Sequence, residues 1–244
     1  MSQTECMEKL NGKKVLIVGA TGGIGSQTAR LLAGSGADLY LSGRKADELS
    51  ALAHSLQVPA ERIFITDLTD EASVNAMAEQ INVQSGALDI LINASGIGII
   101  KPVEQLSLSE FTTTVNANLI GTFILVKAFL PGMKAAKKGL IINIPGVLGK
   151  VPMAGAAAYS ASKYGLVGMM QSIREELKRT DIRITNLFLG GVDSPFWDTI
   201  DLRVQKDKMI RAEEAARAIW FLCQQPSSGV VSEMVLQPFN HQAI

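Results

Sequence analysis

The run Val15-Leu16-Ile17-Val18-Gly19-Ala20-Thr21-Gly22-Gly23-Ile24-Gly25 joins a short apolar segment to a glycine-rich turn, and an amphipathic segment follows at once. In such a strand–turn–helix setting the first glycine permits the tight turn. The other glycines let a phosphate approach the backbone at the positive end of the helix. The run therefore predicts a dinucleotide-binding turn, with a purely structural turn as the alternative. The candidate cofactor residues are Gly19, Thr21, Gly22, Gly23, Ile24 and Gly25.

Short apolar runs alternate with segments of helical periodicity along the whole chain. Most of the short runs are apolar nearly throughout, as is typical of parallel strands buried on both faces. The alternation predicts an α/β fold: a single-domain, Rossmann-type, doubly wound parallel sheet of about seven strands flanked by helices. The expected strands are Val15–Val18, Leu39–Ser42, Ile63–Thr66, Leu88–Asn93, Leu140–Ile144, Ile182–Phe188 and Met234–Gln237. The expected helices are Gly23–Ser35, Ala46–Leu56, Glu71–Gln84, Leu108–Lys138, Ala158–Thr180 and Ala212–Gln224.

No repeat, low-complexity tract or linker divides the 244 residues, so one domain over residues 1–244 is predicted. Residues 1–12 are expected to form a flexible N-terminus. Residues 193–211 interrupt the strand–helix pattern and contain Phe196 and Trp197 among many charges. Since loops at the carboxyl ends of strands form the ligand crevice in such sheets, we expect this segment to be a substrate loop.

The composition narrows the class of protein. Basic and acidic residues number 23 each, so the formal net charge is zero and offers no electrostatic case for nucleic acid or an anionic membrane. Cys6 and Cys223 have neither metal nor disulfide spacing, and neither His54 nor His241 lies near a candidate nucleophile. The N-terminus lacks a signal peptide's apolar region, and no run approaches the ~18 apolar residues of a membrane span. We expect a cytoplasmic protein without a metal.

The second predicted strand ends at Gly43-Arg44-Lys45, where NAD-binding sheets usually place a carboxylate for the ribose 2′-hydroxyl. An arginine can pair with a 2′-phosphate instead, so Arg44 predicts NADP(H) as the cofactor. A solvated cation in a loop is the alternative. Asp67, at the end of the third strand, either accepts a hydrogen bond from the adenine amino group or caps the helix that begins near Asp70.

Tyr159 and Lys163 lie four residues apart in a predicted helix, so their side chains share one face. A phenol with a pKa near ~10 is a poor acid–base group at neutral pH, and we expect the lysine ammonium to lower that pKa. The pair can then exchange a proton with a substrate oxygen as hydride moves at the adjacent carbon. For this spacing alone, a packed tyrosine beside a snorkelling lysine is the alternative.

Together these motifs resemble the short-chain dehydrogenase/reductase family over nearly the whole chain. Arg44 matches a position where NADP-preferring members carry a basic residue. The resemblance implies that Tyr159 is the acid/base, that Lys163 also holds the nicotinamide ribose, and that Asn118 positions the water of a proton relay. It also implies a homodimer or homotetramer. The matching segments are Gly19-Xaa-Xaa-Xaa-Gly23-Xaa-Gly25, Asn93-Ala94-Ser95-Gly96, Asn118-Leu119-Ile120-Gly121-Thr122-Phe123 and Tyr159-Xaa-Xaa-Xaa-Lys163. Further cofactor contacts are expected from Leu68, Asn93, Ala94, Gly96, Gly190, Val192 and Ser194.

Gly146 is the main departure from that family. It lies thirteen residues before Tyr159, where the resemblance implies a catalytic serine that hydrogen-bonds the substrate carbonyl. Loss of one such donor typically costs ~10²–10³ in rate. Ser160 and Ser162 are close in sequence but are expected to point away from the Tyr159 face. Smaller departures are Val18, Ala94 and Leu189.

Two hypotheses follow from these motifs. The first is an NADP(H)-dependent oxidoreductase acting on an apolar or modestly polar carbonyl or alcohol, bound near Gly146, Phe196 and Trp197. The second is a cofactor-binding sensor or scaffold without useful turnover, for which Gly146 is the main support.

Overall fold

The computed structural model describes residues 9–240, so Cys6 and His241 lie outside the described residues. Seven strands form one parallel sheet in the order β3-β2-β1-β4-β5-β6-β9, which confirms the predicted Rossmann-like α/β fold. The dinucleotide turn and the segments that follow β4, β5 and β6 all lie at the carboxyl edge of this sheet. The strands are β1 (Lys14–Val18), β2 (Asp38–Gly43), β3 (Ile63–Ile65), β4 (Ile90–Asn93), β5 (Gly139–Asn143), β6 (Ile182–Leu189) and β9 (Glu233–Leu236).

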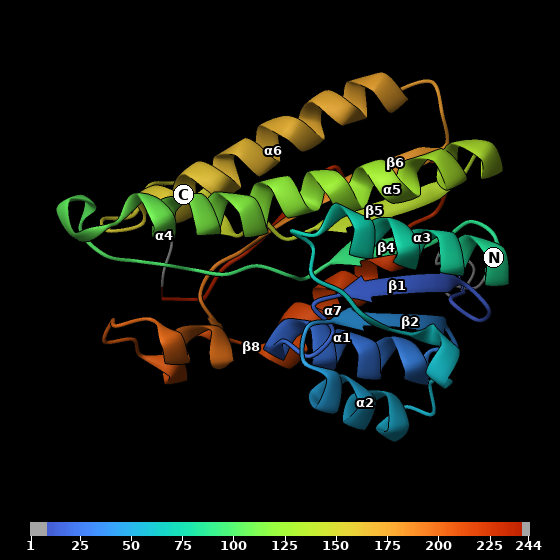
Figure 1. Ribbon diagram of the computed structural model, residues 1–244, viewed down its shortest axis with the longest axis horizontal. Helices are drawn as coiled ribbons and strands as arrows, with labels where there is room; N and C mark the ends of the chain where they lie inside the picture. Colours follow the sequence, from blue (N-terminus) through green and yellow to red (C-terminus); the bar gives the residue numbers. More distant parts are fainter. Residues whose placement is uncertain (1–8, 241–244) are drawn as a thin grey trace.

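Helices cover both faces of the sheet, and each face has its own apolar core (Figure 1). Ile17 of β1 belongs to one core and its neighbour Leu16 to the other, because successive side chains of a strand point to opposite faces. That placement explains why the strand runs are apolar throughout. On one face lie α1 (Gly23–Gly34), α2 (Ala46–Ser55) and α7 (Ala212–Cys223). On the other lie α3 (Glu71–Ser85), α5 (Gly121–Ala136) and α6 (Ala157–Leu177).

The expected helix Leu108–Lys138 is built of three pieces. These are α4 (Leu108–Val115), a π-helical turn over Asn116–Ile120, and α5. Helix α5 ends earlier than expected, because Lys137 takes a left-handed conformation with φ of 54° and acts as the C-cap.

One continuous helical stretch in residues 9–240, Leu108–Ala136, has the length and apolar composition that a membrane crossing requires. About 39% of its most apolar window is buried inside the protein. A core helix of a water-soluble fold has the same length and composition. Helix α5 places Leu125, Phe129 and Met133 in the apolar core on one face of the sheet.

Two segments expected to be irregular contain ordered structure. In the expected flexible N-terminus, residues 1–8 lie outside the description, but Leu10 is only 3% exposed and packs in the core. The expected substrate loop begins within β7 (Val192–Asp193) and ends with β8 (Ile210–Arg211), which pairs with β7 in parallel, and a 3₁₀ turn over Pro195–Thr199 lies between the two strands. Lys206 donates a hydrogen bond to Asp198 at 2.6 Å and so links the 3₁₀ turn to the segment that precedes β8.

Candidate active site

The dinucleotide turn can hold only glycine at two of its positions. Gly19 has φ of +77°, and a Cβ there would lie 2.8 Å from the backbone nitrogen of Ser95. A Cβ on Gly25 would lie 2.1 Å from the carbonyl oxygen of Gly19. Gly22, the N-cap of α1, offers no side-chain cap to the first amides of the helix. Gly22, Gly23 and Ile24 line the central cavity, so the positive end of α1 faces a space where an anion fits.

Gly23 has a neighbour that the sequence motif did not indicate. A Cβ on Gly23 would lie 2.7 Å from Cβ of Ser194 and 3.2 Å from Cδ of Pro195. The expected substrate loop therefore rests directly on the dinucleotide turn. The absence of a side chain at Gly23 makes room for the protein's own loop.

The expected adenosine end lies at the carboxyl ends of β2 and β3. Asp67 Oδ1 accepts hydrogen bonds from the N–H and hydroxyl of Thr69, and these bonds, with the Arg44 charge nearby, lower the pKa of Asp67. The cap of α3 is Asp70, which accepts from the N–H of Ala72, so the capping alternative for Asp67 is wrong. Arg44 is exposed. Thr21 and Leu68 flank this region, Thr21 beside Gly43 and Leu68 with its side chain buried against Gly121.

Tyr159 and Lys163 project from the first turns of α6 to the cavity wall, with Lys163 Nζ 5.5 Å from the Tyr159 ring centroid. Lys163 is 3% exposed and donates to the carbonyl oxygen of Ile144 at 3.2 Å. Burial lowers the pKa of Lys163 to about 8 and raises the pKa of Tyr159 above its ordinary value. The expectation that the ammonium lowers the phenol pKa is therefore wrong for the protein alone, because burial of the phenol raises its pKa.

The lowered pKa of Lys163 predicts a pH-dependent stability. Between about pH 8 and the ordinary pKa of 10.5, the unfolded chain binds a proton that the folded protein lacks. Stability therefore rises with pH in this window, and Lys163→Met should remove that rise. We would measure urea unfolding of both proteins at about pH 7.5, 8.5 and 9.5, below the range where Tyr159 ionises in the unfolded chain. A wild-type minus variant difference that stays constant with pH would contradict the prediction.

Asn118 lies in the π-helical turn and is 2% exposed. Its Oδ1 accepts from the N–H of Ile97 at 2.9 Å, and its Nδ2 donates to the carbonyl oxygen of Ile97 at 2.9 Å and to Ser162 Oγ at 3.0 Å. The carboxamide thus fixes the segment after β4 against α6. The sequence predicts that Ser162 points away from the Tyr159 face. Residues three apart on a helix are neighbours, however, and the Ser162 hydroxyl accepts a hydrogen bond from the catalytic candidate Asn118.

Gly96 brings the catalytic candidates together. A Cβ at this position would lie 3.2 Å from Asn118 Oδ1 and 3.3 Å from Lys163 Nζ. Asn93, at the end of β4, supports the same segment: its Nδ2 donates to Thr122 Oγ1, and its Oδ1 accepts from the N–H of Ser95. The motif Asn93–Gly96 therefore builds the part of the cavity wall that adjoins α6.

Gly146 has φ of 70° and ψ of 169°, a backbone conformation that is essentially restricted to glycine. A Cβ there would lie 3.4 Å from the carbonyl oxygen of Leu189 and 4.0 Å from the Tyr159 hydroxyl. The space beside Tyr159 admits a side chain, but the backbone does not. The loop after β5 is therefore shaped for glycine, and a serine here would be strained.

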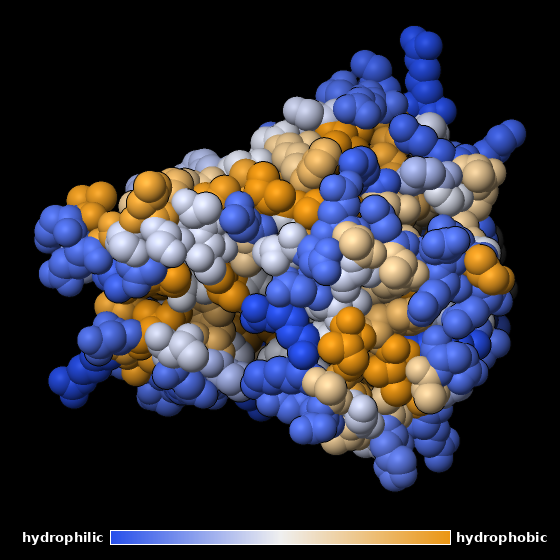
Figure 2. Space-filling model, in the orientation of Figure 1, coloured by the Kyte–Doolittle hydropathy of each residue, from blue (hydrophilic) through white to orange (hydrophobic). Residues whose placement is uncertain are grey.

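These residues surround a cavity of about 630 Å³. Its end near Tyr159 is apolar, and Figure 2 shows hydrophobic residues in the hollow between the α4 end of the molecule and the loop after β7. The apolar lining there comprises Ile100, Val147, Leu148, Val151, Met153 and Phe196. The expected site residues that line the cavity are Gly22, Gly23, Ile24, Ala94, Gly96, Gly146, Tyr159, Lys163, Gly190, Val192, Ser194, Phe196 and Trp197. Those outside its lining are Gly19, Thr21, Gly25, Arg44, Asp67, Leu68, Asn93 and Asn118.

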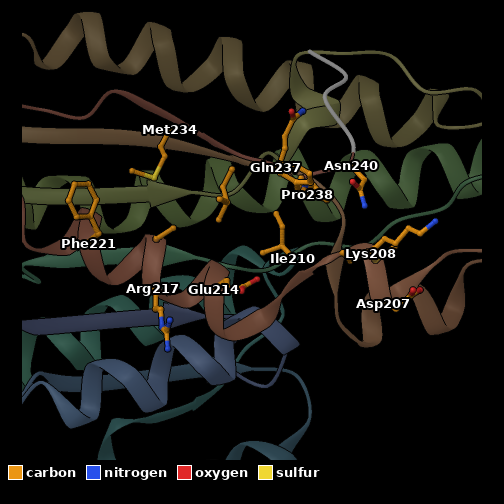
Figure 3. Close-up of a pocket in the computed structure, with 14 residues that line it drawn as sticks. Asp207, Lys208, Ile210, Glu214, Arg217, Phe221, Met234, Gln237, Pro238 and Asn240 are labelled. Carbon is orange, nitrogen blue, oxygen red and sulfur yellow. The ribbon is translucent and has the colours of Figure 1, made fainter.

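A second cavity of about 710 Å³ lies beside the first and contains none of the expected site residues. Figure 3 shows Arg217 and Phe221 on α7, and Asp207 and Lys208 on the segment before β8, among the residues that line this cavity. Lys208 also lines the first cavity, so the two share a wall. In residues 9–240, no group of three or more His, Cys, Asp or Glu side chains is placed to hold a metal ion.

Comparisons with known proteins agree with this geometry. A family model described as short chain dehydrogenase matches residues 13–204. An uncharacterized oxidoreductase of Staphylococcus saprophyticus is 31% identical, covering 95% of this chain and 98% of its own. An alcohol dehydrogenase from the archaeon Thermococcus sibiricus, complexed with 5-hydroxy-NADP, is 26% identical with a TM-score of 0.87, over 96% of this chain and 100% of its own. A metagenomic short-chain oxidoreductase in complex with NADP is 30% identical with a TM-score of 0.82 over the same shares.

Proposed function

The chain belongs to the short-chain dehydrogenase family, and from that membership we propose that it is an NADP(H)-dependent oxidoreductase acting on a carbonyl or alcohol group. The observation that carries the proposal is the pairing of Tyr159 with Lys163 on the wall of one cavity that also contains the uncapped end of α1. A bound nicotinamide cofactor would supply or accept the hydride. The residues of this chain would supply the proton and the orientation.

The amides at the start of α1 would hold the pyrophosphate, and Arg44 would pair with the 2′-phosphate. Two similar structures contain NADP or a derivative of it, which supports this choice of cofactor. Arg44 has an exposed side chain beside Asp67, at the edge of the sheet where the adenosine end is expected.

Arg44→Ala should weaken NADPH relative to NADH. A charge-assisted hydrogen bond contributes about 1.5–3 kcal/mol, so we expect kcat/KM for NADPH to fall about 10–100-fold while that for NADH stays nearly unchanged. Lys45→Ala is the matched control, because Lys45 is exposed and already pairs with Glu48 at 2.6 Å. Equal loss with both cofactors, or an equal loss in the control, would contradict the role of Arg44.

Tyr159 is proposed as the acid/base. Its raised pKa keeps the phenol protonated at neutral pH, so it is ready to donate to a carbonyl oxygen as negative charge develops there. Lys163, held by Ile144, would contact the nicotinamide ribose and stabilise the phenolate after the transfer. Asn118 would support the relay that returns a proton to Tyr159. The apolar lining supports an apolar or modestly polar carbonyl compound as substrate.

Gly146 favours a second candidate, a cofactor-binding protein without useful turnover. The position cannot donate a side-chain hydrogen bond to the substrate carbonyl, and its backbone conformation disfavours a serine. The test is NADPH oxidation over a panel of ketones, aldehydes and quinones, together with NADPH binding measured by fluorescence. Turnover supports the oxidoreductase, while binding without turnover of any member supports the sensor or scaffold.

We further propose a cytoplasmic homodimer or homotetramer that binds neither nucleic acid nor membrane. Phe111 of α4, Phe123 of α5 and Tyr164 of α6 are 37%, 47% and 44% exposed, and a partner subunit would cover such apolar side chains. Sedimentation of the purified protein tests the oligomeric state, and a monomer at micromolar concentration would contradict it.

A further inference from the structure

The need for glycine at position 98 comes from a neighbouring side chain and not from the backbone conformation of Gly98. Its φ lies outside the left-handed range, so other residues can adopt its conformation. A Cβ there would lie 2.3 Å from Cζ and 2.9 Å from Cε2 of Phe196. The tip of the Phe196 ring thus sits on the Gly98 backbone, in the place that a side chain would otherwise fill.

The same ring contacts the catalytic candidate Tyr159. The ring centroids of Phe196 and Tyr159 are 5.8 Å apart, with planes inclined at 52°. Phe196, which lines the cavity, therefore lies next to both α6 and the segment after β4. Both of those segments belong to the proposed active site, so the ring limits the space that a substrate can occupy beside Tyr159.

The position of Phe196 is fixed by its neighbours in the loop. Trp197 packs edge-on against it with centroids 5.3 Å apart, and the Trp197 indole N–H donates to the carbonyl oxygen of Val192 at 2.9 Å. At the base of the loop, Ser194 and Pro195 rest on Gly23. These contacts hold the Phe196 ring in place at the cavity wall.

We propose that Phe196, seated on Gly98, is a specificity-determining residue that restricts the substrate to compact apolar carbonyl compounds. The inference rests on the proposed function and adds the size class of its substrate. The lining of the cavity is mostly apolar, so it favours burial of hydrocarbon over burial of a polar substituent. We therefore expect a fused two-ring ketone to meet the Phe196 ring when its carbonyl lies beside Tyr159.

The kinetic test compares cyclohexanone with 2-decalone, using NADPH, in the wild type, Phe196→Ala, Gly98→Ala and the double variant. Phe196→Ala should raise the kcat/KM ratio of 2-decalone to cyclohexanone at least about tenfold. Gly98→Ala alone should change kcat/KM for both ketones, because its methyl displaces the Phe196 ring. When Phe196 is already alanine, the same substitution should have a much smaller effect, because the methyl then meets Ile200 Cδ1 at 3.3 Å and no longer meets the ring. An unchanged ratio in Phe196→Ala, or additive effects of the two substitutions, would overturn the proposal.

A second readout needs no turnover. The chain has two tryptophans, so in a Trp220→Phe background Trp197 alone emits and reports on its Phe196 neighbour. Gly98→Ala should shift this emission when Phe196 is present and leave it unchanged when Phe196 is alanine. Gly229→Ala, whose methyl meets open space, is the control and should have no effect.

This second readout separates the two proposals. If no variant turns over either ketone or any carbonyl of the panel, but the emission shift depends on Phe196, the contact of the ring with Gly98 stands and the proposed function fails. If the emission shift does not depend on Phe196, the proposed contact between the Phe196 ring and Gly98 is wrong, whatever the turnover.

Discussion

Replacing Tyr159 with phenylalanine is expected to lower kcat for carbonyl reduction about 10²–10⁴-fold. The change removes only the hydroxyl that would donate the proton. The ring and its contact with Phe196 remain, so substrate and cofactor binding should stay nearly unchanged. The measurement is steady-state NADPH oxidation with the best carbonyl of the panel, beside NADPH binding by fluorescence.

Tyr164→Phe is the matched control for this prediction. Tyr164 lies on the same helix but is 44% exposed, and it does not line the cavity. It should retain wild-type kcat. Tyr159→Phe keeping more than about a tenth of the wild-type kcat would remove Tyr159 from the acid/base role. An equal rise in KM with kcat unchanged would mean that the hydroxyl serves substrate binding alone.

Gly25→Ala is expected to abolish NADPH binding and to destabilise the fold. The added methyl would lie 2.1 Å from the carbonyl oxygen of Gly19, so a backbone group of the turn must move. Overpacking of this kind typically costs about 1–3 kcal/mol. The displaced atoms belong to the turn that would hold the pyrophosphate, so the binding loss should exceed the stability loss. Thermal unfolding and NADPH fluorescence titration measure the two effects.

Gly34→Ala provides the comparison within the same helix. A methyl on Gly34 meets nothing within 4 Å, and alanine favours helix over glycine by up to about 1 kcal/mol. This variant should be as stable as the wild type or slightly more stable, with unchanged NADPH binding. If Gly25→Ala binds NADPH as well as Gly34→Ala does, the cofactor does not use this turn.

Local sequence patterns were sufficient to predict the fold, the dinucleotide turn and the pair Tyr159–Lys163. The apolar runs predicted all seven strands, because strands buried on both faces need no polar side chain except near their ends. The turn Gly19–Gly25 and the four-residue spacing of Tyr159 and Lys163 are also local properties. A short run of backbone or one helical turn fixes their geometry.

Helix interruptions were harder to predict from sequence. Leu108–Lys138 is apolar and periodic enough for one helix, yet a π turn interrupts it at Asn116–Ile120. The turn places Asn118 against Ile97 and Ser162, which are distant in sequence. The periodicity of apolar residues along a helix does not reveal a π turn whose side chain is held by residues distant in sequence.

The sequence alone therefore determined the α/β class and the succession of strands and helices along the chain. It also determined the helix face that carries Tyr159 and Lys163. Only the tertiary structure decided the direction of their pKa shifts, because burial depends on all the elements packed around them. It also decided why Gly23 and Gly98 are glycines, since each accommodates a loop that is remote in sequence. Spacing along a chain specifies local geometry, whereas solvation and steric fit arise from contacts that exist only after folding.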